Sequence, residues 1–368
     1  MSGAPLTGPI MIMAGGTGGH VFPGLAVAEA LRGRHGSGVV WLGTQRGIEA
    51  RVVPPLGIDV EWISITGLRG KGVGAWLGAP FRIVGAVLQA LRAVRRRRPA
   101  AVLGMGGFVA GPGGLAAWLA RKPLLLHEQN AVAGTTNRLL APLAARIFAA
   151  YPDTFAASDR VEVIGNPVRA TIAATDAPRE RLVARRAARR RLLIVGGSQG
   201  ARVLNRTLPR ALALLPEAER PEVWHQAGRT TIDEARAAYA EAGVEARVDV
   251  FIDDMPSAYR WADLVVARAG GSTLAELEIV GVGAILVPLA TAIDDHQTAN
   301  ARHFTARGAG TAIAERDLEP AALAGVLEQC LGDVDRLVAM AEAARAQAHP
   351  NAAERLAAAC VAAAEARR

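Results

Sequence analysis

The chain of 368 residues contains only two cysteines, Cys330 and Cys360, and only two of its 42 basic residues are lysines. Two cysteines so far apart form neither a metal-binding nor a redox spacing, which suits a reducing compartment. No stretch of 18 or more residues stays apolar, because Arg82, Gln89 and Arg92 interrupt the longest hydrophobic region. No segment is therefore predicted to span a bilayer.

Several functional motifs are also missing. Val21 stands where the dinucleotide-binding fingerprint Gly-x-Gly-x-x-Gly needs its third glycine, and the Gly-Lys-Ser/Thr of a nucleotide-hydrolase loop does not occur. No Asp-x-Asp pair stands at the end of a predicted strand, and the nearest carboxylate pair is Asp253 with Asp254. These absences weigh against a dehydrogenase and a P-loop hydrolase. We expect no metal site and no cofactor.

The formal net charge is +8, from 42 basic and 34 acidic residues, and it is concentrated in two arginine-rich runs, 95–98 and 179–191. A basic balance suits nucleic acid, an anionic membrane or phosphorylated substrates. Because aromatic residues do not alternate with the arginines, nucleic acid is not expected as a partner. Residues 1–9 lack the basic and apolar parts of a secretion signal, so a cytoplasmic location is expected.

What the chain does contain is a repeated order of short apolar strand, glycine-rich turn and helix. Strands are predicted in the first half at 10–14, 39–42, 101–103, 124–126, 147–149 and 161–164. Strands are predicted in the second half at 192–195, 223–225, 248–252, 264–267 and 284–288. Strands that alternate with helices predict parallel sheets. The expected fold class is α/β, with two doubly wound Rossmann-like domains facing each other across a cleft.

The boundary between the two halves is predicted from a change of composition. The strand–helix order stops at residues 165–169 (GNPVR), and the polar, arginine-rich stretch that continues to residue 191 is the best linker candidate. We expect an N-terminal domain at 1–166 and a C-terminal domain at 167–340. The alanine-rich helix in 341–368 can pack back on the N-terminal domain.

Each half opens with a strand and a glycine-rich turn, at residues 15–19 and 196–200. Such turns bring backbone N–H groups and a helix N-terminus close to an anion, although a single one is more often just a tight connection. Because both halves carry one, the pattern suits a donor with a diphosphate and an acceptor that is also phosphorylated.

Six motifs occur in order along the chain: GGTGGHVFPG (15–24), GMGGFVAGP (104–112), HEQNAVAG (127–134), GNPVR (165–169), GGSQGA (196–201) and FIDDM (251–255). Together they closely resemble the MurG family, the bacterial UDP-N-acetylglucosamine:lipid I N-acetylglucosaminyltransferases. The resemblance covers nearly the whole chain. It implies a GT-B fold, with the acceptor held by the N-terminal domain and the donor by the C-terminal one.

The resemblance also implies a reaction. This is an inverting, metal-independent transfer of N-acetylglucosamine from UDP-N-acetylglucosamine to the C4 hydroxyl of the N-acetylmuramyl unit of undecaprenyl-linked lipid I. The product is lipid II, for peptidoglycan synthesis. The chemistry needs a base for the hydroxyl and stabilisation of the departing UDP diphosphate.

Positions in the motifs assign residues to roles. His20 is the catalytic base or a contact to the acceptor. The residues expected at the acceptor are Gly16, Thr17, Gly106, Gly107 and His127. The residues expected at UDP-N-acetylglucosamine are Thr17, Gly18, Gly19, Asn130, Arg169, Ser198, Gln199, Ile252, Glu276 and Gln297.

Four of the donor assignments are specific. Glu276 corresponds to the family carboxylate that accepts both ribose hydroxyls, since two carboxylate oxygens suit a vicinal diol. Gln297 matches the residue that reads the sugar hydroxyls, and Ile252 is expected against uracil, with backbone groups reading the base edge. The helix N-terminus after residues 198–200, together with Arg169, is expected to stabilise the diphosphate in place of a metal.

Each of these residues also has a purely structural interpretation. His20 can cap its helix, Thr17 can close its turn, and Glu128 can pair with a neighbouring arginine. Two positions depart from some family members: Phe108 stands where a tyrosine can occur, and His296 replaces a second amide. Glu276 can likewise lie on a solvated helix face.

One segment of the first half has an ambiguous apolar pattern. The following residues are spaced like one face of a helix: Trp76, Leu77, Phe81, Val84, Val87, Leu88, Leu91 and Val94. That face can pack on the sheet. Trp76 and Phe81, flanked by Arg69, Lys71 and Arg82, also suit a membrane interface.

Because lipid I is implied as substrate, we expect the N-terminal part of this segment to contact an anionic membrane surface. The protein is then peripheral, on the cytoplasmic face of the plasma (inner) membrane, and other proteins of cell-wall synthesis and division are further expected partners.

Other functions remain open at this point. The chain also fits another GT-B glycolipid glycosyltransferase or a UDP-sugar 2-epimerase, and an epimerase needs no lipid-facing patch. A non-catalytic UDP-sugar-binding scaffold would keep Glu276 but could dispense with His20. The presence of both residues favours an enzyme.

Overall fold

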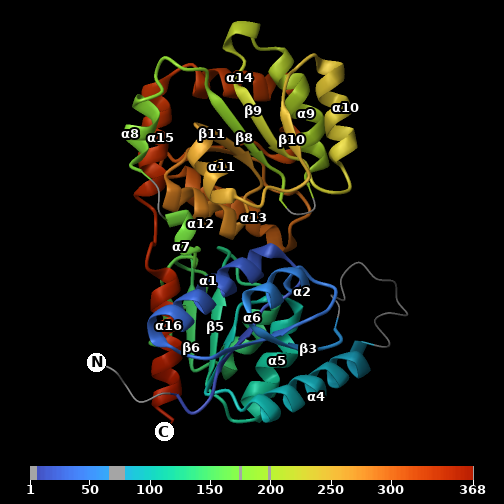
Figure 1. Cartoon of the computed structure of the whole chain (residues 1–368), viewed down its shortest axis with the longest axis vertical. Helices are drawn as coiled ribbons and strands as arrows, with labels where there is room; N and C mark the ends of the chain where they lie inside the picture. Colours follow the sequence, from blue (N-terminus) through green and yellow to red (C-terminus); the bar gives the residue numbers. More distant parts are fainter. Residues whose placement is uncertain (1–5, 66–78, 174–175, 198–199, 368) are drawn as a thin grey trace. The chain divides into compact units, whose positions relative to one another are not determined.

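A computed structural model describes residues 6–65, 79–173, 176–197 and 200–367 (Figure 1). The chain divides into two compact units, one comprising Met1–Arg169 with Pro350–Arg368 and the other Ala170–His349. The observed boundary after Arg169 lies three residues beyond the one expected after residue 166. The second observed boundary, after His349, lies nine residues beyond the one expected after residue 340. The second lies later because helix α15 (Val334–Arg345) still packs on α8 (Pro178–Val183) and α12 (Gly271–Val280) of the second unit.

The described part of the first unit contains a seven-stranded parallel sheet in the order β3-β2-β1-β4-β5-β6-β7. Its strands are β1 (Ile10–Met13), β2 (Val39–Gly43), β3 (Asp59–Trp62), β4 (Ala101–Gly104), β5 (Leu124–Glu128), β6 (Arg146–Ala149) and β7 (Val161–Val163). In the central strands β1 and β4 every residue is buried, as is usual for a parallel sheet covered by helices on both faces. All six strands predicted for this half are confirmed.

Strand β3, Asp59–Trp62, was not predicted, because two of its four residues are acidic. Glu61 is nevertheless buried, since Arg97 donates to its Oε1 at 2.6 Å and Arg96 pairs with its other oxygen. Arg97 also reaches Asp59 at 2.8 Å. The hydrogen bond that Arg97 donates to Glu61 raises the pKa of Arg97 above its ordinary value. Part of the basic run at 95–98 is therefore neutralised by an edge strand.

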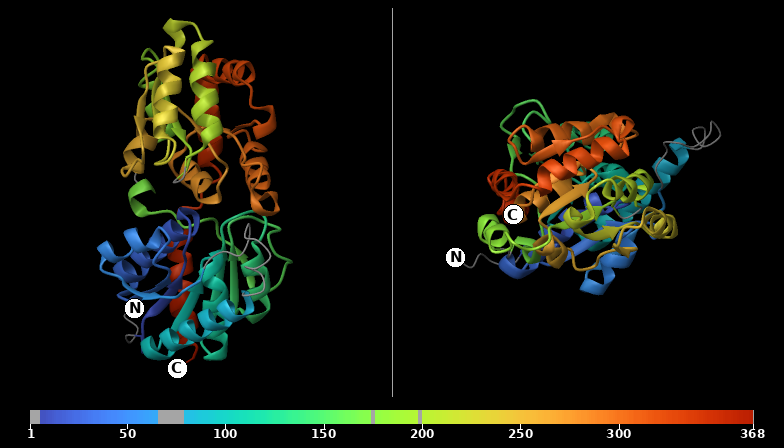
Figure 2. Two further views of the ribbon diagram at one scale, coloured as in Figure 1. Left: turned by 90° about the vertical axis from the view of Figure 1, so that its right-hand side faces the viewer. Right: turned by 90° about the horizontal axis from the view of Figure 1, so that it is seen from above.

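Helices cover both faces of the first sheet (Figures 1 and 2). They are α1 (Gly18–His35), α2 (Glu49–Val52), α4 (Ala79–Arg97), α5 (Gly107–Leu119), α6 (Thr135–Leu140) and α16 (Ala352–Glu365). Alternate residues of β1 point to opposite faces: Ile10 and Ile12 join the core with α1 and α16, whereas Met11 and Met13 join the core with α4 and α5. Helix α16 adds Leu356 to the first of these cores.

Helix α4 does not have the single apolar face that the sequence suggested. It packs on α5 through a narrow face of small residues, Ala86, Val87, Ala90, Ala93 and Val94. Phe81, Val84 and Leu88, spaced three and four residues apart, are 82%, 58% and 48% exposed. The predicted positions thus divide between a buried and an exposed stripe. Trp76, Leu77, Arg69 and Lys71 lie outside the described residues.

The second unit, in its described residues, contains a six-stranded parallel sheet in the order β10-β9-β8-β11-β12-β13. Its strands are β8 (Arg191–Val195), β9 (Glu222–Gln226), β10 (Arg247–Asp249), β11 (Leu264–Ala267), β12 (Ala284–Leu286) and β13 (Gly310–Ala312). Five correspond to predicted strands, although β10 begins and ends earlier than expected. The three-residue edge strand β13 was not predicted, because Gly-Thr-Ala has no apolar run.

The helices of the second unit also enclose a continuous core. They are α7 (Ala170–Ala173), α8, α9 (Arg202–Ala213), α10 (Ile232–Ala242), α11 (Met255–Trp261), α12, α13 (His296–Thr305), α14 (Pro320–Leu331) and α15. Leucines of α9, α14 and α15 pack with Ile194 and Val266 of the central strands. Doubly wound parallel sheets in both units confirm the expected α/β, Rossmann-like fold class.

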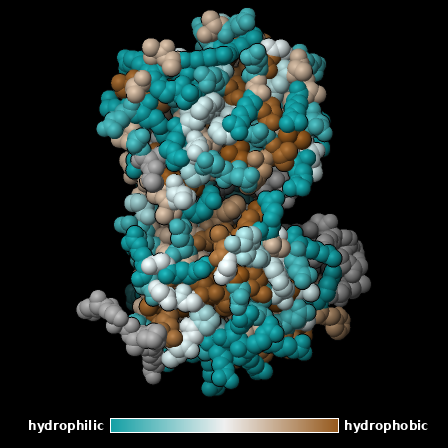
Figure 3. Space-filling view, in the orientation of Figure 1, coloured by the Kyte–Doolittle hydropathy of each residue, from teal (hydrophilic) through white to brown (hydrophobic). Residues whose placement is uncertain are grey.

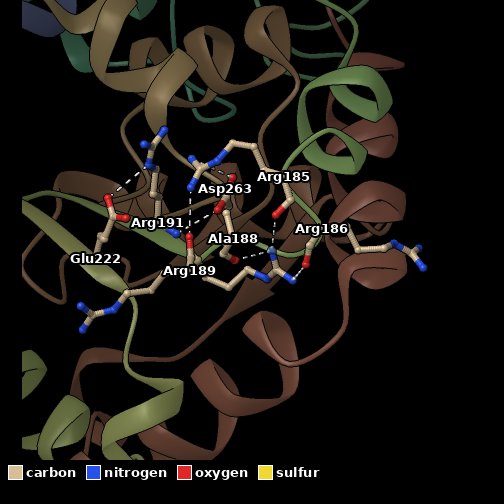
Figure 4. Close-up of polar contacts among 8 residues, drawn as sticks. Arg185, Arg186, Ala188, Arg189, Arg191, Glu222 and Asp263 are labelled. Carbon is tan, nitrogen blue, oxygen red and sulfur yellow. Dashed lines mark hydrogen bonds and ion pairs between the residues drawn. The ribbon is translucent and has the colours of Figure 1, made fainter.

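The arginine-rich segment is not the free linker that its composition suggested (Figure 4). The Arg191 amide donates to Asp263 Oδ2 at 2.9 Å, and Arg185 Nη1 lies 3.9 Å from Asp263 Oδ1. Burial raises the pKa of Asp263 despite these arginines. The Arg190 guanidinium donates to backbone carbonyls of the segment itself, at 3.0 Å for Arg185. These contacts make the segment part of the second unit.

Hydrophilic side chains cover most of the face shown in Figure 3, with apolar ones scattered among them. None of the described helices combines the length and the apolar character needed to cross a membrane.

Candidate active site

The first glycine-rich turn joins β1 to α1 and is held by a buried carboxylate. Glu49 is fully buried, and its Oε2 accepts from the Gly16 amide at 3.0 Å. Its Oε1 accepts from the amide and the hydroxyl of Thr44 at 2.9 and 2.8 Å. Sequence reasoning missed Glu49, because no motif contains it. Thr17 is exposed and makes no side-chain capping bond to α1, so its predicted contact with substrate stays a prediction.

The second glycine-rich turn, between β4 and α5, lies against the first. Gly106 and Gly107 have φ of 88° and 76°, a backbone conformation that favours glycine. A Cβ at Gly106 would lie 3.0 Å from Cε1 and Nδ1 of His20, and a Cβ at Gly107 would lie 2.7 Å from the Gly15 carbonyl oxygen. The fold therefore brings three predicted site residues, His20, Gly106 and Gly107, to one place at the carboxyl edge of the sheet.

His127 lies deeper than expected. Strand β5 continues to Glu128, so His127 is a strand residue rather than a loop residue, and it is completely buried. Burial lowers its pKa to about 4, so the ring is neutral at physiological pH. Its Nε2 lies 3.0 Å from the Gly165 carbonyl oxygen and its Nδ1 lies 3.1 Å from Gln129 Nε2. The predicted direct contact with the acceptor would have to displace one of these partners.

Glu128 organises the loop that follows β5. Its Oε1 accepts from the Asn130 amide at 3.1 Å and its Oε2 accepts from Asn137 Nδ2 at 2.8 Å and from the Gly134 amide at 3.0 Å. Amide groups of this loop thus hold the Glu128 carboxylate in place. Asn130, predicted at the donor, is half-buried and also donates its side-chain amide to Glu128 at 3.2 Å.

Arg169, predicted at the diphosphate, is the last residue of the first unit before the chain enters the second. Its guanidinium carbon lies 5.1 Å from the centroid of the Phe22 ring of α1, a cation–π contact. Its Nε is buried without a hydrogen-bond partner. The charge therefore lies beside the helix that carries His20.

The glycine-rich turn of the second unit joins β8 to α9. Ser198 and Gln199, both predicted at the donor, lie outside the described residues. Gly200 has φ of 77°, and a Cβ there would lie 2.2 Å from the Ala227 carbonyl oxygen, so only glycine fits. The turn leads into the N-terminus of α9, where unpaired N–H groups favour an anion.

Gln226, at the end of β9, connects this turn to the predicted uracil site. It is buried, its Nε2 donates to the Gly197 carbonyl at 3.2 Å, and its Oε1 accepts from the Ile252 amide at 3.1 Å. The Ile252 N–H is therefore already hydrogen-bonded, so the predicted recognition of the uracil edge applies to the Ile252 carbonyl. The residue as a whole is 3% exposed. Sequence reasoning missed Gln226 because a strand-terminal glutamine stands in no motif.

Glu276 is half-buried on α12, and it does not lie on a fully solvated helix face. Its Oε2 accepts a hydrogen bond of 2.9 Å from the hydroxyl of Tyr259, a residue of α11 that is 1% exposed. Gln297 is the second residue of α13, and its Oε1 accepts from the Leu289 amide at 2.9 Å. Asn300, one turn further on, donates to the Ala269 carbonyl at 3.0 Å, which ties α13 to the start of α12.

Asp254 has a structural role. Its carboxylate caps α11 by accepting from the Ser257 amide at 3.1 Å, and hydrogen bonds from Ser257 lower its pKa. Across the described ranges, no group of three or more His, Cys, Asp or Glu side chains is placed to hold a metal ion.

Each unit thus presents a glycine-rich turn and polar side chains at the carboxyl edge of a parallel sheet, where ligands bind in doubly wound folds. Two Rossmann-like units with such turns define the GT-B fold class. Residues 10–149 match the glycosyltransferase family 28 N-terminal domain, and residues 191–356 match the glycosyltransferase family 28 C-terminal domain.

Relatives that align over nearly the whole chain show which kind of family 28 glycosyltransferase the chain is similar to. The chain is 55% identical over 352 residues, 96% of this chain and 98% of the relative, to the UDP-N-acetylglucosamine–N-acetylmuramyl-(pentapeptide) pyrophosphoryl-undecaprenol N-acetylglucosamine transferase of Nitrosococcus oceani. It superimposes on the crystal structure of Acinetobacter baumannii MurG with a TM-score of 0.80 and 40% identity, covering 96% and 99% of the two chains. The chain belongs to this family of glycosyltransferases.

A more distant likeness concerns one of the alternative functions. A protein from Listeria monocytogenes described as a UDP-N-acetylglucosamine 2-epimerase aligns with a TM-score of 0.69 at 16% identity, covering 99% of this chain and 97% of that one. Identity at that level shows a shared fold and nothing about the reaction.

Proposed function

We propose that the chain transfers N-acetylglucosamine from UDP-N-acetylglucosamine to the C4 hydroxyl of the N-acetylmuramyl unit of lipid I, with inversion at C1 of the donor sugar. The product is lipid II for peptidoglycan synthesis. The observation that carries the proposal is that two glycine-rich turns meet around His20, in a chain 55% identical to the Nitrosococcus oceani transferase.

On the acceptor side, His20 takes the proton of the C4 hydroxyl while the hydroxyl oxygen attacks C1 of the donor sugar. Thr17 and the turn at Gly106 and Gly107 hold the acceptor diphosphate through backbone N–H groups and the threonine hydroxyl. Gly16, whose own N–H is bonded to Glu49, shapes the acceptor turn beside them. The half-buried position of His20 against the turn at Gly106 and Gly107 supports this assignment, since the residue stays partly accessible to a substrate.

On the donor side, Glu276 accepts the two ribose hydroxyls, Gln297 binds the sugar, and Ile252 lies against uracil. Gly18, Gly19 and Asn130 complete the donor contacts from the first unit. The bond from C1 to the diphosphate oxygen breaks, and the electron pair leaves with UDP. The turn at 196–200, the N-terminus of α9 and Arg169 stabilise this leaving group electrostatically, without a metal ion.

The substrate lipid places the protein at a membrane surface. The exposed stripe of α4, Phe81, Val84 and Leu88, supports peripheral contact, with Arg82 beside it. Trp118 and Leu119, at the end of the neighbouring α5, are each 50% exposed and are followed by Arg121 and Lys122. Apolar side chains with adjacent cations suit the interface of an anionic bilayer. The protein then acts on the cytoplasmic face of the inner membrane, beside other proteins of cell-wall synthesis and division.

The deciding experiment incubates the purified full-length chain with UDP-N-acetylglucosamine labelled in the sugar and a lipid I analogue. We expect label in a disaccharide-bearing lipid and release of one UDP per transfer. Conversion of the sugar nucleotide without any acceptor would indicate the 2-epimerase alternative. Tight donor binding without turnover would indicate the scaffold, and transfer only to a different lipid would indicate another glycolipid glycosyltransferase.

A further inference from the structure

A chain of hydrogen bonds runs from a backbone carbonyl to His20 and determines where the His20 ring carries its proton. This series of hydrogen bonds begins at Gly165, whose carbonyl oxygen lies 3.0 Å from His127 Nε2. A carbonyl oxygen can only accept, so His127 Nε2 must carry a hydrogen. Because His127 is fully buried and burial lowers its pKa to about 4, the ring is neutral and its Nδ1 is an acceptor.

The side chain of Gln129 forms the next link, and its orientation follows from two acceptors. Its Nε2 lies 3.1 Å from His127 Nδ1 and 3.5 Å from the His127 carbonyl oxygen. Both atoms accept, so the amide nitrogen of Gln129 must face them. Its carbonyl oxygen Oε1 then faces His20 Nδ1, at 3.0 Å. Gln129 is 2% exposed, and Asn166 holds its backbone carbonyl with a further hydrogen bond of 3.0 Å.

An amide oxygen can only accept, so His20 Nδ1 carries a hydrogen, and in the neutral ring the lone pair is on Nε2. We propose that Gln129 is a positioning residue that, anchored through His127 to the Gly165 carbonyl, holds His20 as the tautomer whose Nε2 is the base. Gly106 lies near Cε1 and Nδ1 of the ring and Gly107 lies near its Cδ2, so the glycine turn packs against the ring and keeps it in this orientation.

The inference rests on the proposed function and deepens its acceptor side. When the acceptor hydroxyl attacks C1 of the donor sugar, its proton passes to Nε2 and His20 becomes a cation hydrogen-bonded through both nitrogens. The Gln129 carbonyl dipole then stabilises the positive ring. A carboxylate plays the corresponding part in hydrolase triads, where it orients the histidine and stabilises the imidazolium.

The direct test is independent of activity. Long-range ¹H–¹⁵N spectra of the full chain, labelled with ¹⁵N-histidine, report which nitrogen of each of its seven histidines is protonated. The signals missing in His20→Ala identify His20. We expect the Nδ1–H tautomer for His20 and the Nε2–H tautomer for His127. The Nε2–H tautomer at His20 in the wild-type protein would overturn the proposal even if transfer is observed.

Kinetics supply the second test. Gln129→Met removes the acceptor for Nδ1–H, so kcat should fall about tenfold or more, short of the roughly 10²–10⁴-fold expected for loss of the base. Both KM values should change little, because Gln129 is too deeply buried to touch a substrate. In a His20→Ala background, Gln129→Met should have no further effect. A further loss there would mean that Gln129 supports the fold rather than the histidine.

Two variants separate these outcomes from misfolding. Gln347→Met removes another buried glutamine, whose Nε2 bonds the Phe304 carbonyl in the second unit, and should leave kcat unchanged. In Gln129→Glu one oxygen still accepts from His20 Nδ1–H, and the other, when the buried carboxyl is protonated, donates to His127 Nδ1 as the amide did. The variant should therefore preserve the Nδ1–H tautomer and recover part of the lost kcat. Loss of that tautomer in a folded Gln129→Glu protein would contradict the proposal. If the wild type shows the tautomer but no transfer, only the proposed function fails.

Discussion

The hydroxyl of Tyr259 donates a 2.9 Å hydrogen bond to Oε2 of Glu276, across 17 residues of sequence. Tyr259 is buried on α11, whereas Glu276 is half-buried on α12. The bond holds one carboxylate oxygen of Glu276 in place. In the proposed ribose site, a carboxylate oriented in this way loses little conformational freedom when the donor binds.

Tyr259→Phe should weaken donor binding while leaving the chemical step intact. The variant loses one hydrogen bond, worth about 0.5–1.5 kcal/mol, so the donor KM should rise roughly two- to tenfold with kcat unchanged. Tyr239→Phe is the matched control, because Tyr239 is also a buried tyrosine of the second unit, bonded by its hydroxyl to His225. Equal effects of the two variants on donor KM would point to a general loss of stability.

Glu276→Ala should have a larger effect on the same parameter. Hydrogen bonds to a charged group contribute about 1.5–3 kcal/mol each, so the donor KM should rise by roughly one to three orders of magnitude. Discrimination against a 2′-deoxyribose donor should shrink, because the group that binds the missing hydroxyl is gone. Steady-state kinetics with both donors decide this, and unchanged ribose selectivity would exclude Glu276 from the ribose site.

His20→Ala should reduce turnover by about 10²–10⁴-fold, since no other base is proposed, and should change donor affinity little. The measurement is single-turnover transfer together with titration of UDP-N-acetylglucosamine by calorimetry. A rate near that of the wild type would remove His20 from the mechanism.

Transfer should persist in excess EDTA. The leaving diphosphate is assigned to backbone N–H groups, the α9 N-terminus and Arg169, whose charges do not depend on an ion. Initial rates with EDTA and with added Mg²⁺ or Mn²⁺ test this. Turnover that disappears with EDTA and returns only with metal would contradict it.

Binding to vesicles that contain anionic lipid should weaken with salt and with loss of the exposed α4 stripe. Each cation near the surface is worth about 1 kcal/mol, a contribution that is screened beyond about 8–10 Å at physiological salt. Phe81→Ala with Val84→Ala should lose most of the binding that remains at high salt. Leu214→Ala, which removes an apolar side chain 59% exposed on the second unit, is the control.

The opposite result would exclude the exposed α4 stripe from the membrane contact. Vesicle binding that neither salt nor the double variant changes would place the membrane contact outside α4. The Trp76→Ala/Phe81→Ala pair then tests the preceding segment in the same assay.

Most of the fold could be predicted from local patterns. The strands of both units were recognisable because a buried parallel strand is a short apolar run, and the glycine-rich turns mark where each run ends. Two of the four edge strands, β3 and β13, escaped detection because they lack such an apolar run. β3 carries Asp59 and Glu61, which become compatible with a sheet only after Arg97, 36 residues from Glu61, pairs with them.

What the sequence alone determined, therefore, was the fold class, the family resemblance and the positions of the glycine-rich turns, because each depends on residues close together in the chain. Only the tertiary structure decided that His127 is buried and that Gln129 lies between it and His20, 109 residues away. Only the tertiary structure likewise decided that Gln226 connects Gly197 to Ile252 and that Tyr259 bonds Glu276. A hydrogen bond depends on distance and direction in space, and when its partners come from different strands and helices, only folding brings them together.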